Sequence, residues 1–352
     1  MLRSLESVHR ETILLPYSLS CTASGVAFNY GKSLFSTAVR NSAANYTLTL
    51  KSPLNRRFIN VSSLVLNPGN GGYALGGNAS GASLNTLNIV TKGNGGADLE
   101  PAGIDGILLG YRTAEADKYS GKLFEVHAPM LAPRFLFGQI SSAGASTIGS
   151  GDFISSKTAT GTYSISFRKE FGQTPVIVVM GYDDATATTV SVKTKTASTC
   201  EIEVYDQNAN ALVDGAFSIF VLGSQAVGEC GHESFRTVLT TQRNCRIAGL
   251  CGLSLNSATF TVGGPTTGKD FTSQSTASAN ATFNITDTFA RSSVVVANGD
   301  STILRFLRRG NGISSASQIS LKSADFGGLA FDSGFDAIVV GSDDSTEYFS
   351  AS

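Results

Sequence analysis

Residues 161–180 read GTYSISFRKEFGQTPVIVVM and show the pattern that dominates the chain. Tyr163, Ile165 and Phe167 alternate with small polar residues, which is the period of a strand with one buried and one exposed face. The run that ends the quotation, PVIVVM, is apolar and β-branched after its opening proline, as in a strand covered on both faces. Further alternating runs follow as far as FSIFVLGS at 217–224. With no helical period between them, these runs predict an antiparallel meander of five strands.

The same pattern recurs near the C-terminus with equal spacing between matched aromatic residues. Phe171 and Phe217 are 46 positions apart, and so are Phe289 and Phe335. A third copy nearer the N-terminus closes with IDGILLG, so closing strands begin at 104, 217 and 335, with periods of 113 and 118. Such a period predicts tandem structural repeats. The repeat is anchored by Tyr163, Phe171, Phe217, Gly223, Phe283, Phe289, Phe335, Gly341, Ile104 and Gly110.

We therefore expect an all-β chain of three tandem antiparallel β-sandwich domains related by internal repeat. The length of 352 residues suits two or three domains, each large enough to bury its own core. We expect the three sandwiches to stack along one axis into an elongated body. The expected segments are an N-terminal arm at 1–19, repeat 1 at 20–112, a linker at 113–134, repeat 2 at 135–225, a linker at 226–244, repeat 3 at 245–343 and a C-terminal tail at 344–352.

Composition argues against several classes of partner. Charged residues make up 15% of the chain and the net charge is −1, so we expect neither nucleic acid nor a membrane surface as partner. No stretch approaches the roughly 18 apolar residues of a membrane span, and residues 1–19 lack the pattern of a secretory signal. With 38 glycines and many Ser and Thr residues, the surface is polar without being charged. Such a surface suits a protein that packs against copies of itself.

Motifs with chemical meaning are absent from the sequence. GVAFNYGKS at 25–33 resembles a phosphate-binding loop, but one residue too many separates its glycines and no parallel βαβ pattern follows. The histidines His9, His127 and His232 are scattered, so no nucleophile-base pair emerges. We expect no catalytic residue, no metal and no cofactor, and the protein is predicted not to be an enzyme. A glycan-active enzyme would need paired carboxylates on a defined scaffold.

Five cysteines occur, and none has the spacing of a zinc site. Cys200 lies within a predicted strand and is interpreted as a small buried hydrophobic residue. Cys230, Cys245 and Cys251 lie close together in the sequence, which leaves open a disulfide from Cys230 to either of the other two.

Candidate ligand contacts lie in loops that follow apolar strands and in one basic cluster. The acid pairs directly after these strands are solvated turn residues or contact residues, and the basic cluster is an anion contact or a strand with intersubunit salt bridges. The candidates are Tyr182, Asp183, Asp184, Asp343, Asp344, Arg305, Arg308 and Arg309.

The sequence carries a family resemblance in three of its stretches. TGTYSISFRKEFGQTPVIVV at 160–179, CEIEVYDQNANA at 200–211 and GAFSIFVLGS at 215–224 resemble the H-type lectin-like repeat of phage tail fibres and other virion surface proteins. The resemblance implies a six-stranded antiparallel sandwich that trimerises about its own axis. In sugar-binding members, polar and aromatic loop side chains at subunit clefts hold the ligand. This chain has no Trp, so Tyr182 is the nearest substitute for a sugar-stacking ring.

On this resemblance we expect a non-enzymatic virion structural protein, as a capsid decoration, spike or tail-fibre element. Its expected partners are itself, as a homotrimer, other virion proteins and a host surface glycan. Its expected location is the virion. The alternative is a cell-surface or secreted carbohydrate-binding adhesin built from the same repeats, which would need an export signal or anchor.

Overall fold

The described part of the chain is mostly β-strand. The computed structural model describes residues 12–32, 35–51, 59–67, 70–77, 85–111, 133–181, 188–224, 245–252, 262–263, 271–275, 280–285, 294–299, 306–308, 318–324 and 335–342. Within these ranges there are 25 strands and no α-helix, and all strand pairs but one are antiparallel. The predicted all-β class is therefore confirmed.

Two four-stranded groups form the first sandwich. One contains β1 (Thr12–Thr22), β2 (Gly25–Tyr30), β5 (Ile59–Val65) and β8 (Gly103–Tyr111), in the order β2-β1-β8-β5. The other contains β3 (Phe35–Ser42), β4 (Asn45–Leu50), β6 (Gly72–Gly77) and β7 (Thr86–Gly93), in the order β3-β4-β7-β6. Alternate residues of both groups point between them, because side chains on a strand alternate between its two faces. They form a buried core that includes Tyr17, Tyr46, Leu48, Leu87 and Ile104.

The second sandwich repeats this arrangement farther along the chain. One sheet contains β9 (Pro133–Ile140), β10 (Ser146–Gly149), β13 (Val176–Gly181) and β17 (Phe217–Ser224), in the order β10-β9-β17-β13. The facing strands are β11 (Phe153–Ala159), β12 (Thr162–Phe167), β15 (Thr199–Asp206) and β14 (Thr188–Lys195), with β16 (Ala211–Leu212) added beside β15. Their shared core includes Tyr163, Ile165, Phe171, Ile202 and Phe217.

The third sandwich is built from the remaining strands. One sheet contains β18 (Cys245–Gly252), β19 (Val262–Gly263), β22 (Val294–Gly299) and β25 (Phe335–Ser342), in the order β19-β18-β25-β22. The other contains β20 (Phe271–Ser275), β21 (Asn280–Ile285), β23 (Phe306–Arg308) and β24 (Gln318–Ala324), in the order β20-β21-β24-β23. Apart from β16, strand order is thus the same in all three sandwiches.

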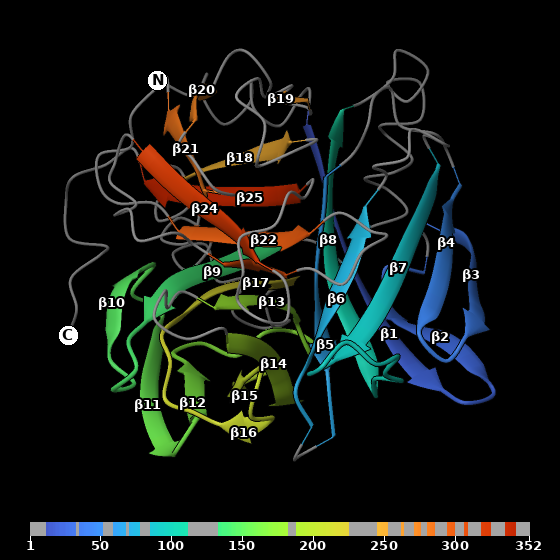
Figure 1. Cartoon of the computed structure of the whole chain (residues 1–352), viewed down its shortest axis with the longest axis horizontal. Coiled ribbons are helices and arrows are strands. Elements are labelled where there is room, and N and C mark those ends of the chain that lie inside the picture. Colours follow the sequence, from blue (N-terminus) through green and yellow to red (C-terminus); the bar gives the residue numbers. More distant parts are fainter. Residues whose placement is uncertain are drawn as a thin grey trace.

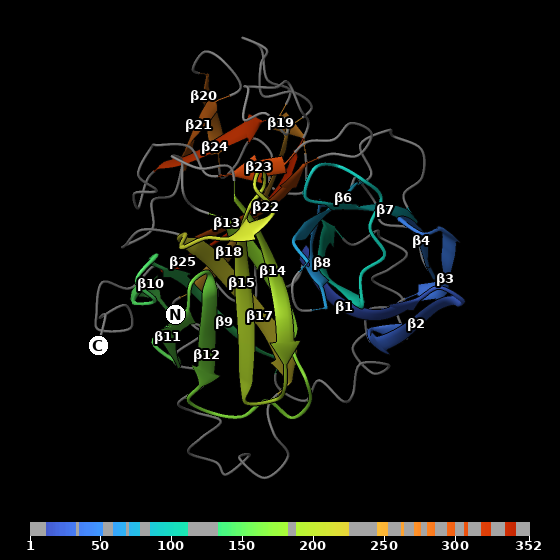
Figure 2. The same cartoon turned by 60° about the horizontal axis from the view of Figure 1, so that its bottom comes forward.

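The sandwiches pack around a common core, and each contacts the other two (Figures 1 and 2). Three cross-strand pairs, one from each sandwich, meet in this core: Val61 with Ile107, Val178 with Phe220, and Val296 with Ile338. Strands β13 and β22 are consequently buried at every position, as expected for a strand covered on both faces. The expected elongated stack is wrong. In each sandwich, the outer face of the sheet that contains β5, β13 or β22 is buried against the other sandwiches instead of facing solvent.

A continuous sheet also joins the first two sandwiches. Strand β5 lies parallel to β14, with Val65 opposite Val192, and the amide of Leu66 donates to the Val192 carbonyl at 3.0 Å. This contact merges two four-stranded groups, and with β16 they form one nine-stranded sheet. An edge strand that would otherwise present unpaired backbone groups is covered in this way.

Two expected boundaries differ from the observed strands. Strand β1 begins at Thr12, so residues 12–19 belong to the first sandwich and not to an arm. Strand β9 begins at Pro133, inside the expected linker at 113–134. In both cases the strand continues because its backbone pairs with the closing strand of its own sandwich: β1 with β8 and β9 with β17.

The repeat anchors lie in the sandwich cores. Phe217 packs against Tyr163 with ring centroids 5.1 Å apart, and Phe335 packs against Phe283 at 5.6 Å. Phe171 and Ile104 are buried as well. Gly223 lies so close to Phe171 that an added Cβ would be 2.8 Å from its ring, which explains a glycine here. Gly110 lies in β8 and Gly341 in β25, while Phe289 is outside the described residues.

Candidate functional site

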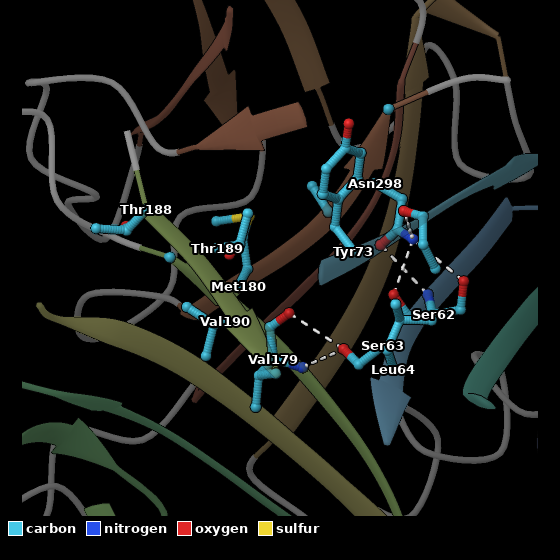
Figure 3. Close-up of a pocket in the computed structure, with 14 residues that line it drawn as sticks. Ser62, Ser63, Leu64, Tyr73, Val179, Met180, Thr188, Thr189, Val190 and Asn298 are labelled. Atoms are coloured by element: carbon cyan, nitrogen blue, oxygen red, sulfur yellow. Dashed lines mark hydrogen bonds between the residues drawn. The ribbon is translucent and has the colours of Figure 1, made fainter. Parts of the chain in front are cut away.

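A hollow lies where the three sandwiches meet, at the ends of β5, β13 and β22 (Figure 3). Its empty volume is ≈ 450 Å³, part of it open to solvent. Corresponding tripeptides of the three edge strands line it, at 62–64, 179–181 and 297–299. They correspond because the middle residue of each tripeptide pairs with the same position of its closing strand. These pairs are Ser63 with Asp105, Met180 with Ser218, and Asn298 with Asp336.

Side chains of the first sandwich bind the edge of the second. The amide of Ile177 donates to Asp105 Oδ2 at 2.9 Å, and the amide of Val179 donates to Ser63 Oγ at 2.8 Å. The Ser63 hydroxyl lies 3.2 Å from the Val179 carbonyl and donates to it (Figure 3). We call such a side-chain acceptor for an edge-strand amide of another sandwich an edge clamp. It satisfies a backbone donor that burial would otherwise leave unpaired.

Side chains of the third sandwich bind the edge of the first in the same way. The amide of Asn60 donates to Asp336 Oδ2 at 3.0 Å, and the amide of Ser62 donates to Asn298 Oδ1 at 3.2 Å. Asn298 Nδ2 donates in turn to the carbonyls of Ser62 at 2.8 Å and Ala74 at 3.2 Å. The two sets of clamps come from corresponding strand positions, Ser63 with Asn298 and Asp105 with Asp336. The amides that they accept from also lie at corresponding positions of the neighbouring edge strand.

A buried ion pair strengthens the contact between the first and second sandwiches. Lys195 Nζ donates to both carboxylate oxygens of Asp105 at 2.6 Å. It also donates to the Pro175 carbonyl at 3.2 Å and to Ser18 Oγ at 3.3 Å. Asp105 is completely buried, so its charge needs such a partner. The lysine of one sandwich thereby neutralises the clamp carboxylate of another.

The hollow is lined by both apolar and uncharged polar side chains. Burial raises the pKa of Tyr73 well above its usual range, so its hydroxyl stays protonated. Thr189 Oγ1 donates to Asn94 Oδ1 at 2.8 Å, whereas Thr188 Oγ1 has no hydrogen-bond partner. The described residues that line the hollow include no Asp, Glu, His, Lys or Arg. The polar groups among them suit a water molecule or a neutral polar group.

Most contact residues expected from the sequence fall outside the described ranges. They are Tyr182, Asp183, Asp184, Arg305, Arg309, Asp343 and Asp344. Gly181, which directly precedes the first three in the sequence, lines the hollow. Arg308 lies in β23.

The cysteines show no reactive or metal-binding arrangement where they are described. Cys21 and Cys200 are free and buried, and burial raises the pKa of Cys21 to about 12 and that of Cys200 above its usual range. Such thiols stay protonated at neutral pH. Cys245 and Cys251 both lie in β18, and Cys230 is outside the described residues, so the disulfide left open stays undecided. Among the described residues no group of three or more His, Cys, Asp or Glu could hold a metal ion.

Two loop motifs have simple structural explanations. Residues 25–30 of the phosphate-loop-like string form β2, which pairs antiparallel with β1. In the stretch DQNANA at 206–211, Asp206 Oδ1 accepts hydrogen bonds from the amides of Asn208 at 2.8 Å and Ala209 at 3.1 Å, which is an Asx turn. No helix in the described chain is long and apolar enough to cross a membrane.

Comparison with known proteins adds no relative: no family model, curated protein or solved structure matches the chain.

The clamp residues were not singled out from the sequence, although one signal for them is present. The closing strands read IDGILLG, FSIFVLG and FDAIVVG, and two of the three carry an aspartate inside an otherwise apolar strand. A charged residue is rarely buried unless it is paired. Asp105 and Asp336 could therefore have been marked as residues with a distant partner, but the sequence does not reveal which partner.

Proposed function

We propose that the three sandwiches are tandem repeats of one β-sandwich unit. Three observations support this: the common strand order, the matched aromatic pairs in the cores, and clamps at corresponding strand positions. Sandwiches that had arisen independently would not be expected to share all three.

We further propose that the protein is a non-enzymatic virion structural protein, as a capsid decoration, spike or tail-fibre element. The observation that carries this proposal is the way the sandwiches are joined. Buried apolar residues of all three form one cluster, and buried carboxylates clamp neighbouring edges. Interfaces with such cores are typical of permanent assemblies, not of domains that move apart during function. The polar, weakly charged composition and the H-type lectin-like resemblance point the same way.

Host contact would come from the candidate residues expected from the sequence. Tyr182, Asp183 and Asp184 follow Gly181, which lines the hollow. Asp343 and Asp344 follow β25 directly, and Arg305 and Arg309 flank β23. We propose these loops as contacts with a host surface glycan or with other virion proteins, with no nucleic acid and no membrane involved. Weak contacts of several loops would add through multivalency.

The homotrimer expected from the sequence stays a prediction. Within one chain, three sandwiches already surround one core, and the sheet faces that meet there are buried. A homotrimer must therefore use other surfaces. The virion proposal does not depend on homotrimerisation, and sedimentation separates a homotrimer from a single chain.

Immunogold labelling of purified particles tests the proposed location. An antibody against the third sandwich should decorate intact virions at regular positions, with preimmune serum as the control. Label on a cell envelope and none on particles would reject the virion proposal in favour of the carbohydrate-binding adhesin.

A further inference from the structure

The three junctions between the sandwiches are not equivalent. At the first–second junction, Ser63 and Asp105 clamp two edge amides, and at the third–first junction Asn298 and Asp336 do so. The second sandwich should offer the corresponding pair to the third. The corresponding residues of the second sandwich are Met180 and Ser218, which face each other across β13 and β17.

Neither residue of this pair forms a clamp. Met180 has no hydrogen-bonding group suited to an amide, and its side chain lies in the hollow (Figure 3). Ser218 is completely buried, yet its hydroxyl has no hydrogen-bond partner among the described residues. A hydroxyl that is buried and unpaired lowers stability instead of adding to it.

The amides on the other side of this junction can be identified by position. In the first sandwich the clamped amides belong to Asn60 and Ser62, three residues and one residue before Ser63. In the second they belong to Ile177 and Val179, three residues and one residue before Met180. The same offsets from Asn298 give Val295 and Ala297 in β22. In the described part of the chain, no side chain accepts a hydrogen bond from either amide.

The second–third junction is nevertheless closely packed. Strand β22 contacts β13, β17 and β9, and Val178, Phe220, Val296 and Ile338 are buried there. This junction is therefore held by apolar contact, whereas the other two combine apolar contact with clamps.

We propose that the four clamp residues determine which sandwich docks on which edge, and that the second–third junction is the seam of the ring. Clamps are directional, so they fix the register of one sandwich against the next. Apolar contact is not directional, and within the described ranges it leaves the edge amides of Val295 and Ala297 without acceptors. The seam is thus the contact that opens first when the full chain fluctuates. This inference rests on the observed junctions and not on the proposed virion role.

Hydrogen exchange of the full-length chain, resolved to single amides, tests the seam. Protection at Val295 and Ala297 should be about tenfold or more below that at Ile177 and Val179, because the latter amides have acceptors. Val294 and Val296, the alternate residues of the same strand, provide the internal control. They should stay protected, since opening the seam leaves β22 paired with β25.

Two matched substitutions complete the test. Ser63→Ala removes a clamp and should lower protection at Val179 about tenfold, towards the value at Ala297. Ser218→Ala removes a hydroxyl that bonds to nothing and should change protection at Val295 by less than about twofold. Equal protection of all three edges in the unmodified protein would overturn the proposal. An equal loss of protection at all amides of β22 would also overturn it, because it would mean that the third sandwich unfolds as a whole.

Discussion

Asp105 in the first sandwich accepts a hydrogen bond from the amide of Ile177 in the second, at 2.9 Å, and pairs with Lys195 at 2.6 Å. One buried carboxylate thus satisfies an edge-strand donor and a lysine of a neighbouring unit. Its place in the closing strand is taken by Asp336 in the third sandwich and by Ser218 in the second. Together with Met180, which stands where Ser63 and Asn298 stand, Ser218 distinguishes the unclamped junction from the two clamped ones.

Replacing Asp105 should destabilise the protein strongly. Asp105→Ala leaves the charge of Lys195 without its carboxylate partner and the buried amide of Ile177 without its acceptor, so we expect the free energy of unfolding to fall by about 3–5 kcal/mol. Chemical denaturation of the full chain measures it. Asp98→Ala is the matched control, because Asp98 pairs with Lys92 while 58% exposed, and should cost less than about 1 kcal/mol. Equal losses would mean that the clamp adds nothing beyond a surface ion pair.

The closing-strand aromatics should be equally important in their own sandwiches. Phe217→Ala and Phe335→Ala each remove a fully buried ring that packs on another ring, and each should cost about 3–5 kcal/mol. Thermal or chemical unfolding measures the loss, and Leu212→Ala, at a 36% exposed side chain, is the control. A change near zero at either phenylalanine would break the proposed alignment of the repeats.

Sequence reasoning succeeded where a local pattern decides the structure and failed where distant contacts decide it. Alternation predicted β12, and the apolar run predicted that β13 is covered on both faces. The same run cannot say whether the second cover belongs to its own sandwich or to a neighbour. The arrangement around one core was missed for that reason. Asp105 and Lys195 are 90 positions apart, and Asn60 and Asp336 are 276 apart, so no spacing rule links them.

Asp152 should make stability depend on pH in the direction opposite to a salt-bridged carboxylate. Burial raises its pKa, and the nearby charges of Arg134, Lys169 and Arg168 only partly offset this effect. The folded chain therefore binds the Asp152 proton more tightly than the unfolded chain does. This group contributes stability below its unfolded pKa, and the contribution is lost as pH rises through the raised folded pKa.

Asp152→Asn tests this dependence because it removes the titration while keeping a similar shape. Relative to the unmodified protein, the variant should gain stability between about pH 3 and pH 7, measured as the difference in denaturation midpoint at each pH. Asp214→Asn should give the opposite slope. Its pKa is lowered by a hydrogen bond from Lys157 and by one from the Gly161 amide, so its contribution is present above the unfolded pKa and lost on acidification. Parallel curves for the two variants would contradict both assignments.

Sedimentation equilibrium should separate a single chain from the homotrimer predicted from the sequence. The sheet faces that meet in the central core are already buried within one chain, so we now expect the 36.6 kDa mass of a monomer. Because intrachain clamps do not depend on protein concentration, the measured mass should stay constant on dilution. A mass three times larger that falls on dilution would show a homotrimer and would require a separate contact surface, which the loops beyond β13 and β25 could provide.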